Sequence, residues 1–442
     1  MNRAGPHPEG ARRPGPREAY AQWIDACTRA GWRGGPDIEQ VPIGEALSRI
    51  TAAPVHARWP SPRLACAAMD GIAIRAGSAA ESAESAGPAA AGHAAGLAAP
   101  ATAGGTWQLA AAAFTWVDTG DPMPPDTDTV VERERVELRA DGSAEITGPA
   151  APGLHVRASG EDFQAGQLLV PAGRRLGPAD LAVAAAAGHA ALAVARRPVV
   201  AIIPTGDEIR PVGSVLGPGE IIDSNSLMLA ARASQVGAVP QVSVVQPDDP
   251  DALAAQTRLA ALSADVVLVI AGSSAGRDDH TAAVLGQVGG VAVRGVAVRP
   301  GHPALLGHVK PPGRVRSAPP AEVVPVIGIP GYPMAAAVIF ELFALPVLAA
   351  LQGARISARG EQRAQLACDW ASPPDVEDWV PVSLAPAPAG TAASAVATPG
   401  RRGAGSTSRL AQADAWWRIP AGRGRFARGE LVDVQPMPGA LL

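Results

Sequence analysis

Carboxylates and hydroxyls gather twice within one short part of the chain. An apolar, β-branched run at 199–203 leads into Thr-Gly-Asp-Glu at 205–208, and Asp-Ser-Asn-Ser at 223–226 precedes a helical pattern. In an open α/β sheet, ligands bind beyond the carboxyl ends of the strands, and free N–H groups at a helix start attract anions. The stretch therefore predicts a site for a phosphate and a hard cation.

Each acidic residue of this stretch also has a purely structural interpretation. Asp223 or Ser224 can cap the helix that follows, while Asp207 and Glu208 can be solvated turn residues. Taken singly, these interpretations are the stronger ones. Similar loops elsewhere in the chain favour a ligand-binding role for these acidic residues over a purely structural one.

Three further loops carry glycine beside polar or charged residues. They are residues 271–281 after the apolar strand 265–270, residues 299–303, and residues 330–333 after the strand 323–329. Strands and helices alternate from about residue 199, and continuous apolar strands are typical of a parallel sheet buried on both faces. We therefore expect a parallel sheet whose strand ends converge on one pocket.

Taken together, these blocks resemble the molybdopterin molybdotransferase family, known as MoeA in bacteria and as the E domain of gephyrin in animals. The resemblance covers most of the chain, and the order and spacing of its motifs carry it. The matching blocks are residues 41–62, 68–73 (AMDGIA), 119–124 (TGDPMP), 160–162 (GED), 171–194, and the TGDE, DSN, AGSSAG, PGHP and IPGYP loops.

The resemblance implies a multidomain α/β plus β architecture and an elongated homodimer whose active site lies between subunits. The expected parts are a disordered arm (1–15), a split linking domain (16–45 and 148–195), a β-rich second domain (46–147), a molybdopterin-binding α/β domain (196–355) and a C-terminal small β-domain (356–442). Composition and local pattern suggest surface excursions at 79–105 and 310–320, a helix at 45–50, and a flexible loop at 385–397.

The chemistry implied by the resemblance is insertion of molybdenum from molybdate into adenylylated molybdopterin, with Mg²⁺-dependent release of AMP. The catalytic candidates are Asp70, Asp162, Glu208, Asp223 and Asp279, with Glu208 and Asp223 as metal ligands and Asp70 supplied by the partner subunit. The ligand-binding candidates are Thr205, Gly206, Asp207, Ser224, Asn225, Gly272, Ser273, Ser274, Gly276, Pro330 and Gly331. Arg299 and His302 are the oxyanion candidates.

Alternatives remain for the candidates outside the first stretch. Asp70 precedes Gly71 as an ordinary turn residue does, and Asp162 can end a turn. Asp279 can cap a helix, and Asp278 can take its place in the comparison with the family.

The chain departs from the family pattern at several positions of the ligand-facing loops, five of which bear on the ligand. Arg277 replaces an acidic residue, Tyr332 replaces the asparagine of Pro-Gly-Asn-Pro, and Ala335 replaces a serine. Two lysines around Pro-Gly are here Arg299 and His302, of which only the arginine carries a permanent charge. These departures leave molybdate or tungstate open as the oxyanion.

Composition agrees with an intracellular enzyme. At roughly 150 residues per domain, 442 residues suggest about three domains. A net charge of −4 argues against nucleic-acid binding, and three scattered cysteines suggest a reducing cytoplasm without disulfides. The start of the chain lacks the apolar core of a secretory signal. The apolar helix expected at 334–351 contains Glu341 and Pro346, so we expect it to be buried rather than membrane-spanning.

Three functions remain open at this level. The first is an active molybdotransferase, which contacts a molybdopterin adenylyltransferase and acceptor molybdoenzymes transiently, with tungstate-specific insertion as a variant. The second is a non-catalytic molybdopterin carrier or scaffold. The third, a single-domain adenylyltransferase, leaves residues 41–162 and the C-terminal segment unexplained. Retained acidic positions favour catalysis, because a carrier has little need of a magnesium site.

Overall fold

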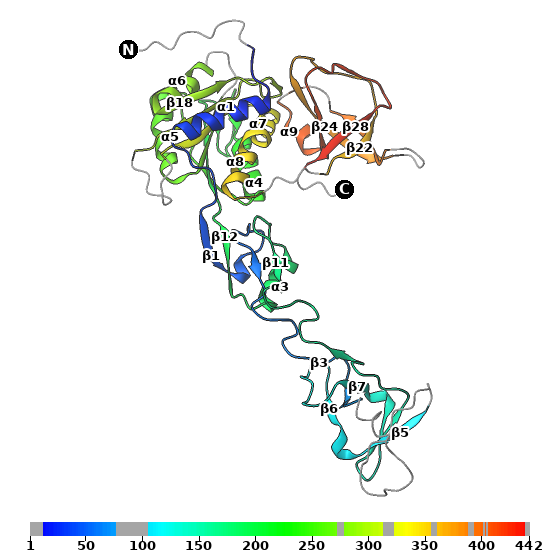
Figure 1. The fold of residues 1–442 in the computed structure, drawn as a ribbon. Helices are drawn as coiled ribbons and strands as arrows, with labels where there is room; N and C mark the ends of the chain where they lie inside the picture. The colour runs from blue at the N-terminus through cyan, green and yellow to red at the C-terminus, as the bar shows by residue number, and fades with distance from the viewer. Residues whose placement is uncertain are drawn as a thin grey trace.

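The chain forms an elongated molecule with its two largest units at one end (Figure 1). The computed structural model describes residues 12–76, 105–271, 278–312, 322–354, 360–387, 393–400, 403 and 405–437. An α/β unit and a C-terminal β unit lie together, a small linking unit follows, and a distal β unit lies at the far end. The multidomain α/β plus β architecture expected from the sequence is confirmed.

The α/β unit is built on a six-stranded sheet of order β16-β13-β17-β21-β20-β18. Its strands are β13 (Val199–Pro204), β16 (Val239–Val242), β17 (Val266–Ala271), β18 (Gly289–Arg294), β20 (Leu305–Val309) and β21 (Val324–Pro330).

The expectation of a purely parallel sheet was wrong for two of these strands. Strands β16, β13, β17 and β21 are parallel, whereas β20 is antiparallel to β21 and β18 is antiparallel to β20. No helix connects β18 to β20, and short connections allow only antiparallel pairing. Leu305 at the start of β20 pairs with Gly328 near the end of β21, so the loop 299–304 still lies at the same edge of the sheet.

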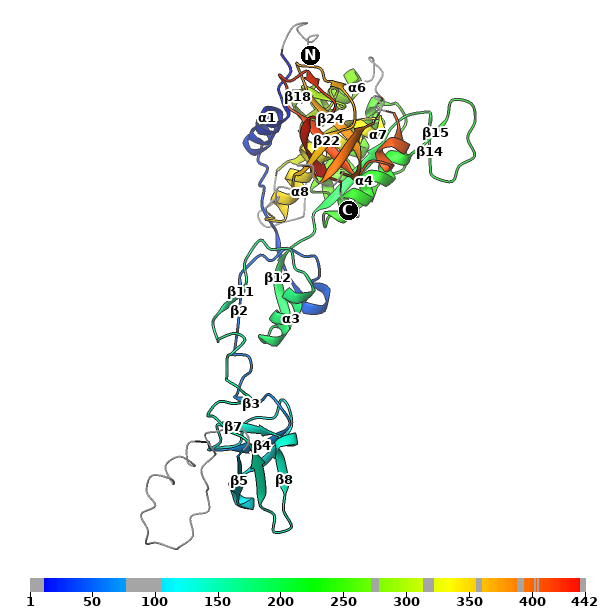
Figure 2. The same ribbon diagram turned by 90° about the vertical axis from the view of Figure 1, so that its right-hand side faces the viewer.

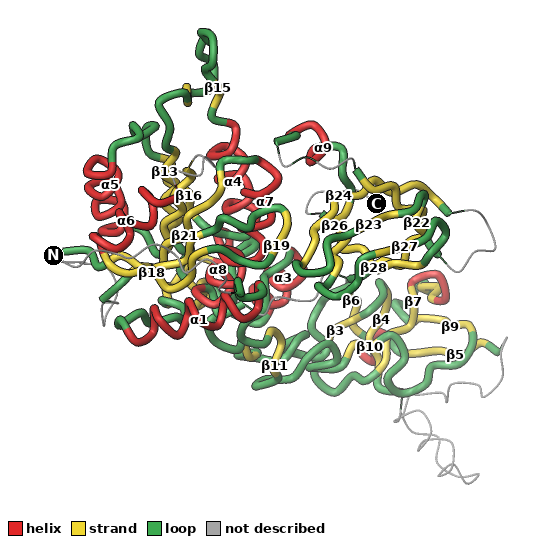
Figure 3. Tube along the Cα trace, turned by 90° about the horizontal axis from the view of Figure 1, so that it is seen from above, coloured by secondary structure: helices red, strands yellow, loops and turns green. Residues whose placement is uncertain are grey.

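Helices cover both faces of this sheet. Alternate residues of β13 enter different cores: Val200 and Ile202 pack with the helices on one face, and Ala201 and Ile203 with those on the other (Figure 3). The first face carries α1 (Pro16–Arg29), α4 (Ser224–Gln235), α7 (Pro333–Ile339), η4 (Phe340–Ala344) and α8 (Leu345–Leu351). The second carries α5 (Pro250–Ser263) and α6 (Asp278–Val288).

The continuous helix from α7 to α8 is a core helix, as expected. By length and composition Pro333–Leu351 is apolar enough to cross a membrane, with a mean hydropathy of 2.3, but 61% of that window is buried inside the protein. Its middle turn, η4, is π-helical and ends two residues before Pro346, which lies near the start of α8. Proline has no N–H to donate, and its ring would clash with the carbonyl one turn earlier in a regular α-helix. The wider π-helical turn makes room for this ring.

Helix α1 packs on the α/β unit, although its residues fall in the range expected for the linking domain. It contacts β18, β20 and η4. Trp23 is fully buried there, and its indole N–H donates to the carbonyl of Gly307 at 2.6 Å. Of the range 1–15 expected to be a disordered arm, only residues 12–15 are described, and the carbonyl of Pro14 accepts a hydrogen bond from the N–H of Ala297.

The linking unit is small and holds its own core around Val194, Leu176 and Val170. It contains β1 (Ile38–Pro42), η1 (Ile43–Glu45), β2 (Val55–His56), β11 (Leu168–Val170), α3 (Pro178–Ala186) and β12 (Ala191–Ala195). The helix expected at 45–50 does not form. Only the 3₁₀ turn η1 is present, and Ser48 has a φ of 62°, a left-handed conformation that a helix cannot continue through.

An ion-pair network joins the linking unit to the α/β unit. Arg196 lies between β12 and β13 and donates to the carboxylates of Asp37 and Asp265, each at 2.9–3.0 Å in its closest contact. Asp265 is buried and also accepts from the N–H of Val199. This geometry fixes the chain where it passes between the two units.

The distal unit consists of short antiparallel sheets around Ile72 and Ile146. Its elements are β3 (Cys66–Ala67), β4 (Gly71–Ile74), β5 (Thr106–Leu109), η2 (Ala111–Ala113), β6 (Thr115–Val117), β7 (Thr129–Glu132), η3 (Arg133–Arg135), β8 (Val136–Leu138), β9 (Ala144–Thr147) and β10 (Val156–Arg157). The excursion expected at 79–105 lies outside the described residues, except for Gly105.

The C-terminal unit is the expected small β-domain. Its elements are β22 (Gln362–Leu366), β23 (Trp370–Ala371), β24 (Glu377–Pro386), β25 (Ala395–Pro399), α9 (Thr407–Ala411), β26 (Ala415–Ile419), β27 (Arg425–Phe426) and β28 (Leu431–Pro436). Pairing of β24 with both β25 and β26 closes five strands into a ring. The loop expected at 385–397 was partly wrong, because Ala385 pairs with Val396 in the ladder.

A short strand ties the C-terminal unit to the α/β unit. Strand β19 (Val298–Arg299) precedes the loop 299–304 and pairs in parallel with β24, Val298 opposite Glu377 and Arg299 opposite Asp378. The C-terminal unit is thereby held at the edge of the sheet where the strands β13, β17 and β21 end.

Candidate functional site

The loop after β13 is anchored to the neighbouring strand. The N–H and the hydroxyl of Thr205 both donate to the carbonyl of Ile270, at 3.0 and 2.9 Å. Gly206 is buried with a φ of 138°, and a Cβ at this position would lie 2.8 Å from Oε2 of Glu208. Glycine is therefore favoured by the backbone conformation at this position, and the Glu208 side chain lies against it.

Helix α4 begins beside this loop. Oδ1 of Asp223 accepts a hydrogen bond from the N–H of Ser226 at 3.0 Å, which is N-cap geometry. Nδ2 of Asn225 donates to the carbonyl of Gly331 at 2.6 Å, so the helix start is tied to the loop after β21. Oδ1 of Asn225 is buried and has no hydrogen-bond partner among the described residues. This acceptor is available to a ligand donor.

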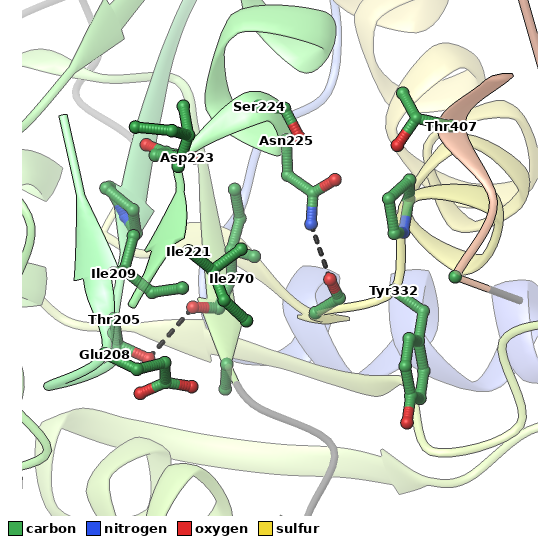
Figure 4. A pocket seen from close by; sticks show the side chains of 16 residues that line it. Thr205, Glu208, Ile209, Ile221, Asp223, Ser224, Asn225, Ile270, Tyr332 and Thr407 are labelled. Carbon is green, nitrogen blue, oxygen red and sulfur yellow. Dashed lines mark hydrogen bonds between the residues drawn. The ribbon is translucent and has the colours of Figure 1, made fainter. Parts of the chain in front are cut away.

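These segments surround one pocket with a cavity volume of about 470 Å³. Its lining consists of Pro204, Thr205, Glu208, Ile209, Ile221, Ile222, Asp223, Ser224, Asn225, Ile270, Ala271, Gly331, Tyr332, Pro333, Gly405 and Thr407. Figure 4 shows the carboxylates of Glu208 and Asp223 on the same side of the pocket, separated by isoleucine side chains. The structure thus brings both predicted metal ligands to one pocket, without direct contact between them.

The structural interpretation of Asp223 and its proposed role are compatible. One oxygen of its carboxylate caps α4, and a carboxylate has further lone pairs that can bind a cation. Glu208 makes no such cap, and its partly exposed side chain faces the cavity.

Among the described residues, the lining contains two carboxylates and no lysine, arginine or histidine. An anionic ligand would therefore meet only hydroxyls, N–H groups and negative charge. No cluster of three or more His, Cys, Asp or Glu suited to a metal occurs within the described ranges. Mg²⁺ needs fewer protein ligands, because it retains waters and shares substrate phosphates, so the oxygen donors of this pocket fit that ion.

Several predicted residues lie outside the lining. Asp207 is exposed and accepts a hydrogen bond from the N–H of Asp248, and Pro330 is buried in β21 opposite Ala271. Arg299, the last residue of β19, and His302, in the loop between β19 and β20, are both exposed. Gly272, Ser273, Ser274 and Gly276 lie outside the described residues, as does the side chain of Asp279 on α6.

Asp70 and Asp162 also lie elsewhere in the chain. Asp70 is in the distal unit, at the opposite end of the molecule from the pocket (Figure 1). Its Oδ1 accepts hydrogen bonds from the hydroxyl and the N–H of Thr119, both at 2.7 Å, and these bonds hold the pKa of the Asp70 carboxyl below its ordinary value. Asp162 is exposed, and its N–H donates a hydrogen bond to the carbonyl of Ser61. Neither joins the pocket of its own chain.

Residues of the C-terminal unit line the pocket, which was not predicted from the sequence. Gly405 and Thr407, at the start of α9, line the pocket opposite the loop after β13. No local motif marks them, because their position depends on the pairing of β19 with β24.

Ile209, Ile221 and Ile222 also line the pocket, which was likewise not predicted from the sequence. They belong to the short strands β14 (Ile209–Arg210) and β15 (Ile221–Ile222) at the base of an arm that projects from the unit (Figure 2).

Three family models match successive parts of the chain. They are the MoeA N-terminal region (domain I and II) at residues 16–188, a probable molybdopterin binding domain at 201–350, and the MoeA C-terminal region (domain IV) at 363–437. The pocket lies mainly within the second match, and its remaining wall comes from the third.

Named relatives and solved structures agree with these matches. The chain is 35% identical over 318 residues to a molybdopterin molybdenumtransferase of Nostoc sp., covering 72% of this chain and 70% of the relative. It is 32% identical to molybdopterin molybdenumtransferase 2 of Mycobacterium tuberculosis, covering 75% and 80%. A molybdopterin biosynthesis MoeA protein structure from Pyrococcus horikosii has 30% identity and a TM-score of 0.76, covering 97% of this chain and 100% of that one.

Proposed function

Because this chain belongs to the MoeA family, we propose that its pocket is the molybdopterin-binding active site of a molybdopterin molybdenumtransferase. The chain is a transferase of molybdenum cofactor biosynthesis, with molybdopterin and molybdate as its substrates. The observation that carries the proposal for the pocket is the convergence of Glu208, Asp223 and the start of α4 beyond the carboxyl ends of the strands.

We propose that adenylylated molybdopterin is the form that binds and that AMP leaves as molybdenum is inserted. Glu208 and Asp223 would hold Mg²⁺, which when bound polarises the phosphoanhydride and offsets the negative charge of the leaving AMP. The hydroxyls of Thr205 and Ser224 line the same pocket and provide donors for phosphate oxygens. Asn225 orients the loop after β21 through its bond to Gly331 and offers its unpaired Oδ1 to a ligand donor.

AMP release from adenylylated molybdopterin tests this proposal directly. With Mg²⁺ and molybdate present, we expect turnover that stops when the cation is chelated and returns when Mg²⁺ is restored. Parallel reactions with tungstate identify the preferred oxyanion. Tight binding of molybdopterin without AMP release in either reaction would contradict catalysis and support the carrier function.

We also propose that the protein is a homodimer in which the distal unit of one subunit completes the pocket of the other. Asp70 is exposed, ionised and far from the pocket of its own chain, which fits a role in another subunit. Asp162 and the loop with Arg299 and His302 are further candidates for contact with the complete substrate. A cytoplasmic location and transient contacts with a molybdopterin adenylyltransferase and with acceptor molybdoenzymes belong to the same proposal.

Mixing two inactive variants is expected to restore part of the activity if Asp70 acts across the dimer. An Asp70→Asn subunit paired with a Glu208→Gln subunit gives one site that retains both carboxylates. Molybdate-dependent AMP release after subunit exchange measures the recovery, with up to about half of the sites active in each heterodimer.

The matched control pairs Glu208→Gln with Asp223→Asn, two residues of the same pocket. Each site of that heterodimer lacks one carboxylate, so no recovery is expected. Equal results for the two mixtures, with subunit exchange demonstrated by differently tagged subunits, would show that Asp70 does not act in the partner's pocket.

A further inference from the structure

Among the described residues that line the pocket, one is a large aromatic residue, Tyr332. Tyr332 follows β21 and precedes α7, and its carbonyl accepts the hydrogen bond of Ala336 at 2.9 Å, so its backbone is fixed at the helix start. Its side chain makes no capping hydrogen bond and is 48% exposed. A half-exposed tyrosine with a fixed backbone provides a flat apolar surface at low entropic cost.

The C-terminal unit supports this ring from behind. A Cβ placed on Gly405 would lie 3.6 Å from Cδ1 and 3.8 Å from Cε1 of Tyr332, so the segment before α9 passes directly beside the ring. Helices α7 and α9 are in contact, and the pairing of β19 with β24 fixes the C-terminal unit in place. The ring of Tyr332 is therefore held between α9 and the cavity.

The wall across the cavity is apolar as well. Figure 4 shows Ile209 and Ile221 on the side of the pocket opposite the tyrosine, with the carboxylate of Glu208 below them. The lining thus combines an aromatic face, an aliphatic face and polar groups toward its ends. A flat ring fits between two such faces, while attached phosphates fit the polar ends.

We propose that Tyr332 is a specificity-determining residue that stacks on the flat heteroaromatic ring of the substrate. This inference rests on the proposed function, since adenylylated molybdopterin contains two such rings, the pterin and the adenine. Both present a π-face to a tyrosine side chain, and the binding experiment below distinguishes them. The phenolic hydroxyl is not needed for stacking, so phenylalanine should replace tyrosine without loss.

The experiment compares Tyr332→Phe and Tyr332→Ala by equilibrium binding of three probes. AMP carries the adenine, molybdopterin carries the pterin, and ribose 5-phosphate has a phosphate without an aromatic ring. Tyr332→Ala is expected to weaken the ligand with the stacked ring roughly tenfold, within the range measured for base–aromatic stacking, and to leave ribose 5-phosphate unchanged. Tyr332→Phe should bind all three like the unaltered protein.

Two further variants separate stacking from a general disturbance. Gly405→Leu places a side chain against the ring, because the described atoms within 4 Å of a Cβ at this position belong to Tyr332, and it should weaken the same probe as Tyr332→Ala does. Leu259→Ala removes a side chain of similar exposure, 60%, from α5 outside this pocket and should have no effect on any probe. Loss of AMP binding identifies the adenine as the stacked ring, and loss of molybdopterin binding identifies the pterin.

Unchanged binding of both AMP and molybdopterin to Tyr332→Ala would overturn the stacking role, and so would an equal loss of ribose 5-phosphate. In both cases Mg²⁺-dependent AMP release by the unaltered protein would leave the proposed function standing. If the unaltered protein binds neither AMP nor molybdopterin, the proposed function itself fails, and the inference about Tyr332 fails with it.

Discussion

Asp223→Asn and Glu208→Gln are each expected to lower the rate of AMP release roughly 100- to 1000-fold, the usual cost of removing one electrostatic stabiliser from an active site. Each substitution keeps the size of the side chain and removes its charge. The pocket has no other carboxylate among its described lining residues, so one of two negative groups that can hold a cation is lost. Single-turnover AMP release at saturating Mg²⁺ measures the effect.

Helix capping must be separated from catalysis at Asp223. The asparagine of Asp223→Asn retains a side-chain oxygen for the N–H of Ser226, whereas Asp223→Ala loses the cap and should also lower the free energy of unfolding by about 1 kcal/mol. Asp249 provides the matched control, because it caps α5 in the same way and lies outside the pocket. Asp249→Asn should leave AMP release unchanged. Full activity in Asp223→Asn and Glu208→Gln would remove both carboxylates from the mechanism.

The elements that place these carboxylates were predictable from the sequence. Strands β13, β17 and β21 are continuous apolar runs, and each is followed by a glycine-containing loop, so their type and their common edge follow from local pattern and parallel pairing. The N-cap role of Asp223 was open as a structural alternative, and the structure confirms it. In this pocket, Asp223 can both cap α4 and bind a cation.

The features that could not be predicted from the sequence depend on contacts between segments far apart in the chain. Tyr332 was visible only as a departure from the family pattern, and its neighbour Gly405 carries no local signal. The same holds for the two antiparallel strands, because the apolar pattern of β20 does not distinguish strand direction. Long-range pairing, such as that of β19 with β24, decided these features.

Trp23→Ala is expected to destabilise the α/β unit by about 3–5 kcal/mol, the usual cost of truncating a buried aromatic side chain. Trp23 is fully buried on the sheet, with its ring edge-on to Tyr20 at 6.2 Å and to Phe343 at 6.4 Å between centroids. Its indole N–H donates to Gly307 of β20, so α1 is tied to the sheet by both packing and a hydrogen bond. Urea unfolding followed by hydrogen exchange of the β18 and β20 amides measures the loss in this unit.

Two substitutions test the explanation for Trp23. Trp23→Phe retains most of the apolar packing but leaves the carbonyl of Gly307 without this donor, so its cost should lie between zero and that of Trp23→Ala. Trp116→Ala removes a tryptophan that is 40% exposed in the distal unit and should leave exchange in β18 and β20 unchanged. Because the distal unit has its own core, a change there does not reach the sheet that α1 covers. Unaltered protection of β18 and β20 in Trp23→Ala would show that α1 packs on the sheet without stabilising it.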